Sequence, residues 1–244
     1  MDMAGSDRRR VLRLGGAVGV AAAGGVAAAY GLNAVADAGV TEAAKPSAQP
    51  SPSATAKPPD GSTLVTFVGG TAGPWRVDRI QPVRGEALPP AARVAMVVGQ
   101  PTAPGPGAAW TLRGAVSYER YARRVEHDAL AQRSAPLGRP EATSTAMIAI
   151  KKSPDWWAMP QDERRRIFEE QSQHITTGQR FLPAIARRLH HSRDLGEPFD
   201  FVTWFDYAPG AADAFEDLVT RLRLSPEWDF VVREVDILLA REGP

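Results

Sequence analysis

The chain has 244 residues, of which 43% are hydrophobic, and its 29 basic and 28 acidic side chains give a formal net charge of +1 at pH 7. This near-neutral charge argues against a role in binding nucleic acid, because such proteins need a basic surface to neutralise phosphates. Cysteine is absent, which excludes disulfide bonds, zinc–thiolate sites and covalent attachment of c-type haem to this chain. Any metal must be held by histidine or carboxylate side chains, or must arrive inside a cofactor.

The first segment has the layout of an export signal. A basic stretch that includes Arg8, Arg9 and Arg13 is followed by an uncharged run over residues 14–32, composed mostly of Gly, Ala and Val. The adjacent arginines resemble the twin-arginine signal, which export machinery reads on proteins that are already folded. We therefore predict a signal peptide over residues 1–38 and a periplasmic location. The alternative is an uncleaved membrane anchor, although Gly and Ala make the run only weakly hydrophobic.

The next segment has the composition of a linker. Residues 45–62 consist mainly of Pro, Ser, Ala, Thr and Lys, with hardly an apolar side chain larger than Ala. Such a stretch cannot bury enough apolar surface to offset the entropy that folding removes. We therefore predict a disordered linker over residues 39–62 and a folded domain over residues 63–244.

The first half of the folded domain contains three predicted strands and one predicted helix. The strands are runs of β-branched and aromatic residues at residues 64–68, 92–98 and 110–116. An amphipathic helix is predicted over residues 118–131, where large side chains recur at helical spacing: Tyr118, Tyr121, Val125 and Leu130.

The second half alternates helices with strands. An apolar run at residues 145–150 predicts a strand, and residues 153–157, which contain the adjacent Trp156 and Trp157, are interpreted as a loop. Taken alone, two neighbouring tryptophans indicate hydrophobic packing. Helices are predicted over residues 160–181 and 211–224, and strands over residues 199–207 and 228–239.

The strand at residues 199–207 alternates strictly. Thr203 and Phe205 share one face, whereas Val202 and Trp204 share the other. Helices that alternate with such strands indicate an antiparallel sheet covered by helices on one face. We therefore predict an α+β fold of the ferredoxin-like type, whose sheet either stays open or closes into an α/β barrel.

Residues 174–192 are unusual for a purely structural segment. They contain three of the four histidines, two adjacent arginines and Pro183. On one straight helix, His174 and Arg187 would lie about 20 Å apart, from a rise of about 1.5 Å per residue. We expect Pro183 to end or bend a helix and so let Arg187 approach a site that His174 ligates. The alternative is a solvated helical face.

His190 and His191 are interpreted as structural, with a pair of ligands for a non-haem metal as the alternative. His190 and His191 are adjacent, and neighbouring residues on a helix or strand point in different directions. His127 lies among charged residues on the first predicted helix and is expected at the surface.

Five separated motifs resemble the chlorite dismutase family, in its order and near its spacing. They lie at residues 151–157, 162–165, 174–192, 200–205 and 227–228. The resemblance extends from residue 64 to residue 241 and covers nearly all of the predicted folded domain. The Phe67-Val68-Gly69-Gly70 run and the compact stretch before the first helix resemble the short subgroup, whose members are dimers. One departure is Asp206, which stands where a glutamate is common.

The resemblance implies a site for haem b. His174 falls at the position of the proximal iron ligand, and Arg187 falls at that of the mobile distal arginine. Glu227 matches the carboxylate that accepts a hydrogen bond from the ligand histidine and tunes the iron. The remaining cofactor-binding positions are Lys152 and Trp156, near the haem propionates and edge, and Leu189, Thr203 and Phe205 on the distal wall.

The resemblance also implies a reaction and an assembly. The reaction is decomposition of the small anion chlorite to chloride and dioxygen, through oxygen-atom transfer to ferric haem and formation of the O–O bond. Arg187 suits it, because a guanidinium stays charged and offers planar donors to an oxyanion. The assembly is a homodimer. Two alternatives share the fold: a haem-binding sensor or carrier with weak peroxidase activity, and a coproheme decarboxylase. The decarboxylases lack an arginine at the position of Arg187 and act in the cytoplasm.

Overall fold

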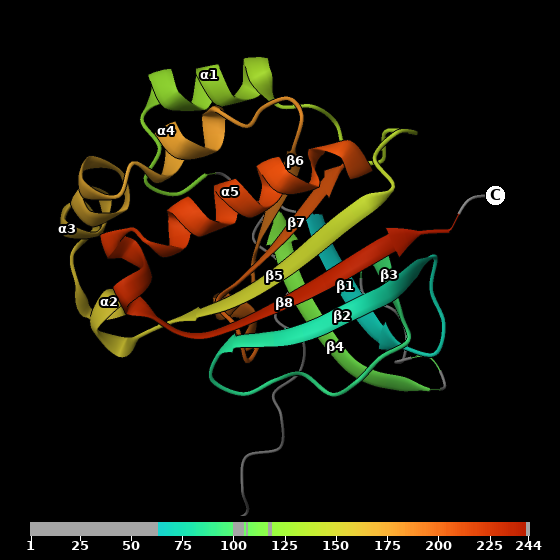
Figure 1. Ribbon diagram of the computed structural model, residues 1–244. Coiled ribbons are helices and arrows are strands. Elements are labelled where there is room, and N and C mark those ends of the chain that lie inside the picture. Colours follow the sequence, from blue (N-terminus) through green and yellow to red (C-terminus); the bar gives the residue numbers. More distant parts are fainter. Residues whose placement is uncertain (1–62, 100–104, 106, 117–118, 243–244) are drawn as a thin grey trace, which may run out of the picture. The chain divides into compact units, whose positions relative to one another are not determined.

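The computed structural model describes residues 63–99, 105, 107–116 and 119–242 of the chain. Within these residues, eight strands form a closed antiparallel barrel with helices packed outside it (Figure 1). No helix in this part of the chain is long and apolar enough to cross a membrane. The predicted signal peptide (residues 1–38) and linker (residues 39–62) lie outside the described residues.

The strands follow the order β1-β3-β2-β8-β5-β7-β6-β4 around the barrel. Their bounds are β1 Thr63–Gly70, β2 Trp75–Arg84, β3 Arg93–Val98, β4 Ala108–Val116, β5 Ser144–Lys152, β6 Ala186–His191, β7 Phe201–Tyr207 and β8 Val231–Arg241. The last four strands lie side by side, and their strand–helix–strand–strand–helix–strand connectivity is compatible with the predicted ferredoxin-like arrangement. The predicted antiparallel sheet is confirmed.

The helices cluster on one side of the barrel, where α5 lies across β5 and β7 (Figure 1). Their bounds are α1 Arg124–Arg133, α2 Pro154–Ala158, α3 Gln161–Arg165, the π-helix η1 Arg166–Gln171, α4 His174–Gln179 and α5 Ala212–Arg223. Three short 3-10 helices in the described residues are η2 Arg193–Leu195, η3 Pro209–Ala211 and η4 Pro226–Phe230.

The alternation of β7 divides the protein into two cores. Val202 and Trp204 point into the barrel, where Trp204 stacks on Phe67 with ring centroids 5.8 Å apart. Phe205 and Tyr207 point outward and pack against α5. Both faces of β7 are therefore buried. The outward face lies beneath the helices, where it can line a site.

Two features of the first half were predicted wrongly. Strand β2 was not predicted, because its ten residues carry charges and a proline instead of a β-branched run. That strand is held mainly by backbone pairing with β8. The helix predicted over residues 118–131 begins only at Arg124. Tyr121 has a φ of 65°, in the left-handed region that helices exclude, and Val125 is 72% exposed.

Three features of the second half also differ from the prediction. Residues 153–157 form a capped helix, α2, because the Ser153 hydroxyl accepts a hydrogen bond from the Trp156 amide at 3.3 Å. The single helix predicted over residues 160–181 is divided into α3, η1 and α4, with a break at Gln173, whose φ is 51°. The strand predicted from residue 228 begins at Val231.

Arg187 does not lie on a continuation of the helix that carries His174. Helix α4 ends at Gln179, and Arg187 is the second residue of β6. Of the two expected alternatives, an end or a bend near Pro183, the structure has an end: the helix stops at Gln179, before Pro183, and a loop joins it to the barrel. His174 and Arg187 approach the site from different layers of the fold.

Candidate functional site

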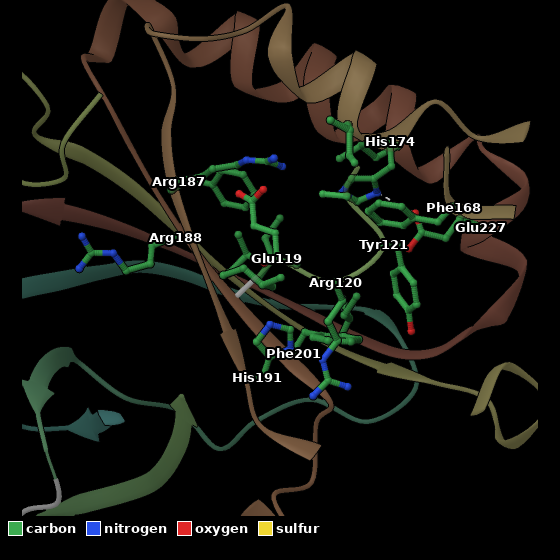
Figure 2. Close-up of a pocket in the computed structure, with 18 of the residues that line it drawn as sticks. Glu119, Arg120, Tyr121, Phe168, His174, Arg187, Arg188, His191, Phe201 and Glu227 are labelled. Carbon is green, nitrogen blue, oxygen red and sulfur yellow. Dashed lines mark hydrogen bonds and ion pairs between the residues drawn. The ribbon is translucent and has the colours of Figure 1, made fainter. Parts of the chain in front are cut away.

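A cavity lies between the outward face of β5, β7 and β6 and the helices that cover it (Figure 2). The eight residues predicted for the site all line this cavity: Lys152, Trp156, His174, Arg187, Leu189, Thr203, Phe205 and Glu227. They come from six different elements, so the fold assembles a site that is dispersed over 76 positions of the sequence, from residue 152 to residue 227.

The imidazole of His174 is oriented by Glu227. His174 is the first residue of α4, and its Nδ1 lies 2.6 Å from Oε2 of Glu227. Glu227 lies in η4, and its backbone amide donates to the Ser172 hydroxyl at 2.9 Å. Because Nδ1 is occupied by the carboxylate, Nε2 is the nitrogen that remains available to a ligand in the cavity.

Lys152 holds the same carboxylate from its other side. The Lys152 ammonium donates to Glu227 Oε1 at 2.7 Å and to the Glu227 carbonyl at 3.3 Å, and it lies 4.5 Å from the centre of the Trp156 ring. Burial alone would raise the pKa of Glu227, but His174 and Lys152 together lower it to about 2. The ammonium is thus directed at the Glu227 carboxylate.

Two aromatic rings lie nearly parallel to the His174 imidazole. The Phe168 ring of η1 has its centroid 4.4 Å away at an interplanar angle of 22°. The Trp228 ring of η4 is 6.4 Å away at 18°. Stacking on its faces and a hydrogen bond at its edge restrict rotation of the imidazole, as a metal ligand requires.

Arg187 projects into the cavity from β6 (Figure 2). Arg187 is partly exposed as a residue, and within the described part of the chain its guanidinium has no hydrogen bond or ion pair, so its donors are available. Gly178 of α4 makes room for it: a Cβ at this position would lie 3.1 Å from Arg187 Nη1. Burial lowers the pKa of Arg187, while the nearby carboxylate of Glu119 opposes that shift.

The wall beside Arg187 is mostly apolar. Strand pairing sets Arg187 opposite Phe205 and Leu189 opposite Thr203, so these four side chains lie together on the outward face. Helix α5 adds Leu218, Val219 and Leu222. The predicted placement of Thr203 and Phe205 on one face is confirmed.

Several lining residues were not predicted from the sequence: Glu119, Arg120, Tyr121, Phe168 and His191. His191 was interpreted as structural, but it lies on the same face of β6 as Arg187 and Leu189. Its neighbour His190 is structural as expected: it is fully buried, its Nδ1 lies 3.0 Å from the Val202 carbonyl, and burial lowers its pKa to about 4. His127 is exposed, as predicted.

The donor set of the cavity fits haem better than a bare metal ion. No group of three or more histidine, aspartate or glutamate side chains suited to a metal ion occurs in the part of the chain that the structure describes. A single oriented histidine beside a large, mainly apolar cavity is instead the arrangement that ligates haem iron. The buried Nε1 of Trp156, which has no hydrogen-bond partner among these residues, is a further donor at the cavity wall. The fold and site thus define a class of protein that brings one oriented histidine and one arginine into a single, mainly apolar cavity.

Comparison with known proteins agrees with this class. The family model described as chlorite dismutase matches residues 109–242. A solved structure of dimeric chlorite dismutases from Nitrobacter winogradskyi is 51% identical, with a TM-score of 0.68, and the match covers 72% of this chain and 99% of that one. The chain belongs to the chlorite dismutase family.

More distant relatives share less. The curated chlorite dismutase of Ideonella dechloratans is 33% identical over 87 residues, so the match spans 36% of this chain but only 28% of that relative. A mutant chlorite dismutase from Candidatus Nitrospira defluvii, solved in complex with cyanide, has a TM-score of 0.55 at 17% identity, and the match covers 75% of this chain and 92% of that one. The second likeness bears on the fold alone.

Proposed function

We propose that this protein is a haem b-dependent chlorite dismutase, which converts chlorite to chloride and dioxygen. The observation that carries the proposal is the pairing, in one cavity, of a carboxylate-oriented histidine with an arginine that has no partner among the described residues. Family membership supports the same conclusion.

His174 would hold the iron of the haem through Nε2. Glu227, kept ionised by His174 and Lys152, accepts the hydrogen bond from Nδ1 and so fixes the tautomer and the orientation of the imidazole. Bound haem supplies an iron centre that can accept an oxygen atom from the substrate. Trp156, Leu189, Thr203 and Phe205 would pack around the cofactor.

Arg187 would bind the anion and keep it in place. Its planar donors match a small oxyanion, and in a mainly apolar cavity a fixed positive charge acts more strongly than it would in water. The apolar wall formed by Leu189 and Phe205 offers little that a reactive oxygen species could oxidise. Both oxygen atoms of chlorite leave as dioxygen and chlorine leaves as chloride, so the reaction needs no further oxidant or reductant.

We also propose that the protein is exported and forms a homodimer. The adjacent Arg8 and Arg9 ahead of an uncharged run support recognition by the twin-arginine machinery and a periplasmic location. The 51% identical relative from Nitrobacter winogradskyi is described as dimeric. Light scattering of the mature protein and fractionation of cells that produce it would test these two points.

An oxygen electrode tests the activity. Chlorite added to the purified, haem-loaded protein should release dioxygen, and Arg187→Ala should slow this release strongly, by about 100-fold or more, the loss typical of removing a key charge-stabilising donor. Release that is absent, or unaffected by the substitution, would contradict the mechanism.

A further inference from the structure

We propose that Glu234, a residue outside the cavity, is a positioning residue for His174 and acts through Trp228. The inference rests on the proposed function, because it concerns how the chain holds the ligand histidine. It adds a connection that runs from β8 and α5 to the proximal side of the site.

The first link is the turn η4. Glu227 and Trp228 are consecutive, and both meet His174: the carboxylate of Glu227 at the ring edge and the indole of Trp228 nearly parallel to the ring. Trp228 is 7% exposed and lines the cavity. The orientation of the indole therefore limits the orientations open to the imidazole.

The second link is a hydrogen bond behind the indole. Trp228 Nε1 donates to Glu234 Oε2 at 2.9 Å, and Glu234 is completely buried in β8. An indole has only this one donor, so its direction fixes the rotation of the ring within its pocket. Neither Glu234 nor Arg223, its partner on α5, belongs to the cavity lining.

The third link neutralises the buried carboxylate. Glu234 Oε1 accepts two hydrogen bonds from Arg223 of α5, from Nε at 2.8 Å and from Nη2 at 2.6 Å. Arg223 Nη2 also donates to both oxygens of Asp236, at 2.7 and 2.8 Å. A buried charge needs such a partner to be tolerated, and here the pairing uses Oε1 while Oε2 stays directed at Trp228.

This division of roles supplies a matched pair of variants. Glu234→Gln and Asp236→Asn each remove one carboxylate from Arg223, but only Glu234 contacts Trp228. Trp228→Phe is a third variant, which keeps an aromatic ring and removes the donor. If Glu234 served only stability, Glu234→Gln and Asp236→Asn would have similar effects. If Glu234 positions His174 through Trp228, only Glu234→Gln changes the His174 site.

The test uses haem-loaded protein and two measurements besides activity: the rate of haem transfer to an excess of apomyoglobin, and the iron–histidine stretching band of the reduced form in resonance Raman spectra. Glu234→Gln and Trp228→Phe should shift or broaden this band and release haem about threefold to tenfold faster, below the 10–100-fold effect typical of a direct partner of the ligand. Asp236→Asn should leave the band in place.

Two results would overturn the inference. One is a band in Trp228→Phe identical to that of the parent protein; the other is equal behaviour of Glu234→Gln and Asp236→Asn. A parent protein that shows no iron–histidine band would contradict the proposed function itself, which keeps the two failures distinguishable. If Glu234→Gln fails to fold, Trp228→Phe alone decides the outcome.

Discussion

Nδ1 of His174 and Oε2 of Glu227 lie 2.6 Å apart although 53 positions separate the two residues. One begins helix α4 and the other lies in the turn before β8. The contact fixes which imidazole nitrogen faces the cavity, and His174 and Lys152 together keep the carboxylate ionised. Three residues therefore form a chain of contacts on the proximal side of the proposed haem site: the Lys152 ammonium binds the Glu227 carboxylate, and this carboxylate binds the His174 imidazole.

Glu227→Gln tests this chain. The amide removes the negative charge, leaves the Lys152 ammonium without its counter-charge, and can offer only a weaker acceptor to His174. We expect haem affinity or activity to fall about 10-fold to 100-fold, as for other direct partners of metal-ligating histidines. Asp229→Asn, on the exposed side of the same turn, is the matched control. Equal haem binding by both variants would argue against the role of Glu227.

Glu119→Gln tests the charge near Arg187. Figure 2 shows the Glu119 carboxylate directed toward the guanidinium, and it is the nearby charge that opposes the lowering of the Arg187 pKa. Removing this negative charge should strengthen binding of a small anion such as fluoride to the ferric protein, on the order of tenfold for one partly screened charge pair. Optical titration measures the affinity. Glu119→Asp, which keeps the charge, should stay close to the parent value, and a weaker affinity in the glutamine variant would refute the prediction.

Gly178→Ala tests the space beside Arg187. The added methyl group would lie 3.1 Å from Nη1, so the guanidinium must move by a few tenths of an ångström. Alanine also favours the helix over glycine by up to about 1 kcal/mol. We therefore expect activity to fall several-fold while the melting temperature stays constant or rises.

Gly210→Ala is the control for this substitution, because no other group lies within 4 Å of its added Cβ. It should leave the oxygen-release rate unchanged. Full activity in Gly178→Ala would show that the position of Arg187 is not constrained by α4.

His190 predicts a pH dependence of stability. Burial lowers its pKa from 6.5 to about 4 in the folded protein. Between these values the unfolded chain binds a proton that the folded chain does not, so stability is complete above about pH 6.5 and declines as pH falls toward 4, by on the order of 3 kcal/mol for this residue. His190→Gln should flatten this part of the profile, measured by urea unfolding. The same decline in His190→Gln and in the surface variant His127→Gln would assign it to other groups.

Residues that the fold brings into one cavity were identified from the sequence, although several of the elements that carry them were predicted wrongly. The eight site positions were chosen from motifs, and this choice did not require a correct prediction of secondary structure. All eight line one cavity. By contrast, Glu119 was missed because residues 119–123 were assigned to a helix. Phe168 was missed because it lies in a π-helix, whose wider turn changes which side chains share a face.

Long-range contacts explain the remaining differences. Nothing in the local sequence indicates that the Lys152 ammonium turns to Glu227, since the pair is 75 positions apart and forms only when η4 closes onto β5. His191 could have been found: the alternation that identified Thr203 and Phe205 on β7 also applies to β6, but no strand was predicted over residues 186–191. Strand β2, largely exposed and paired with β8, carries no hydrophobic pattern to detect.

The most direct test of the account is the origin of the oxygen atoms in the product. Chlorite labelled with oxygen-18 is supplied to the haem-loaded protein in unlabelled water, and the released gas is analysed by mass spectrometry. If Arg187 retains the substrate fragments in the cavity until the O–O bond forms, the dioxygen carries two labelled atoms, and Arg187→Ala yields less of it. Dioxygen that carries one or no labelled atom would contradict the proposed function.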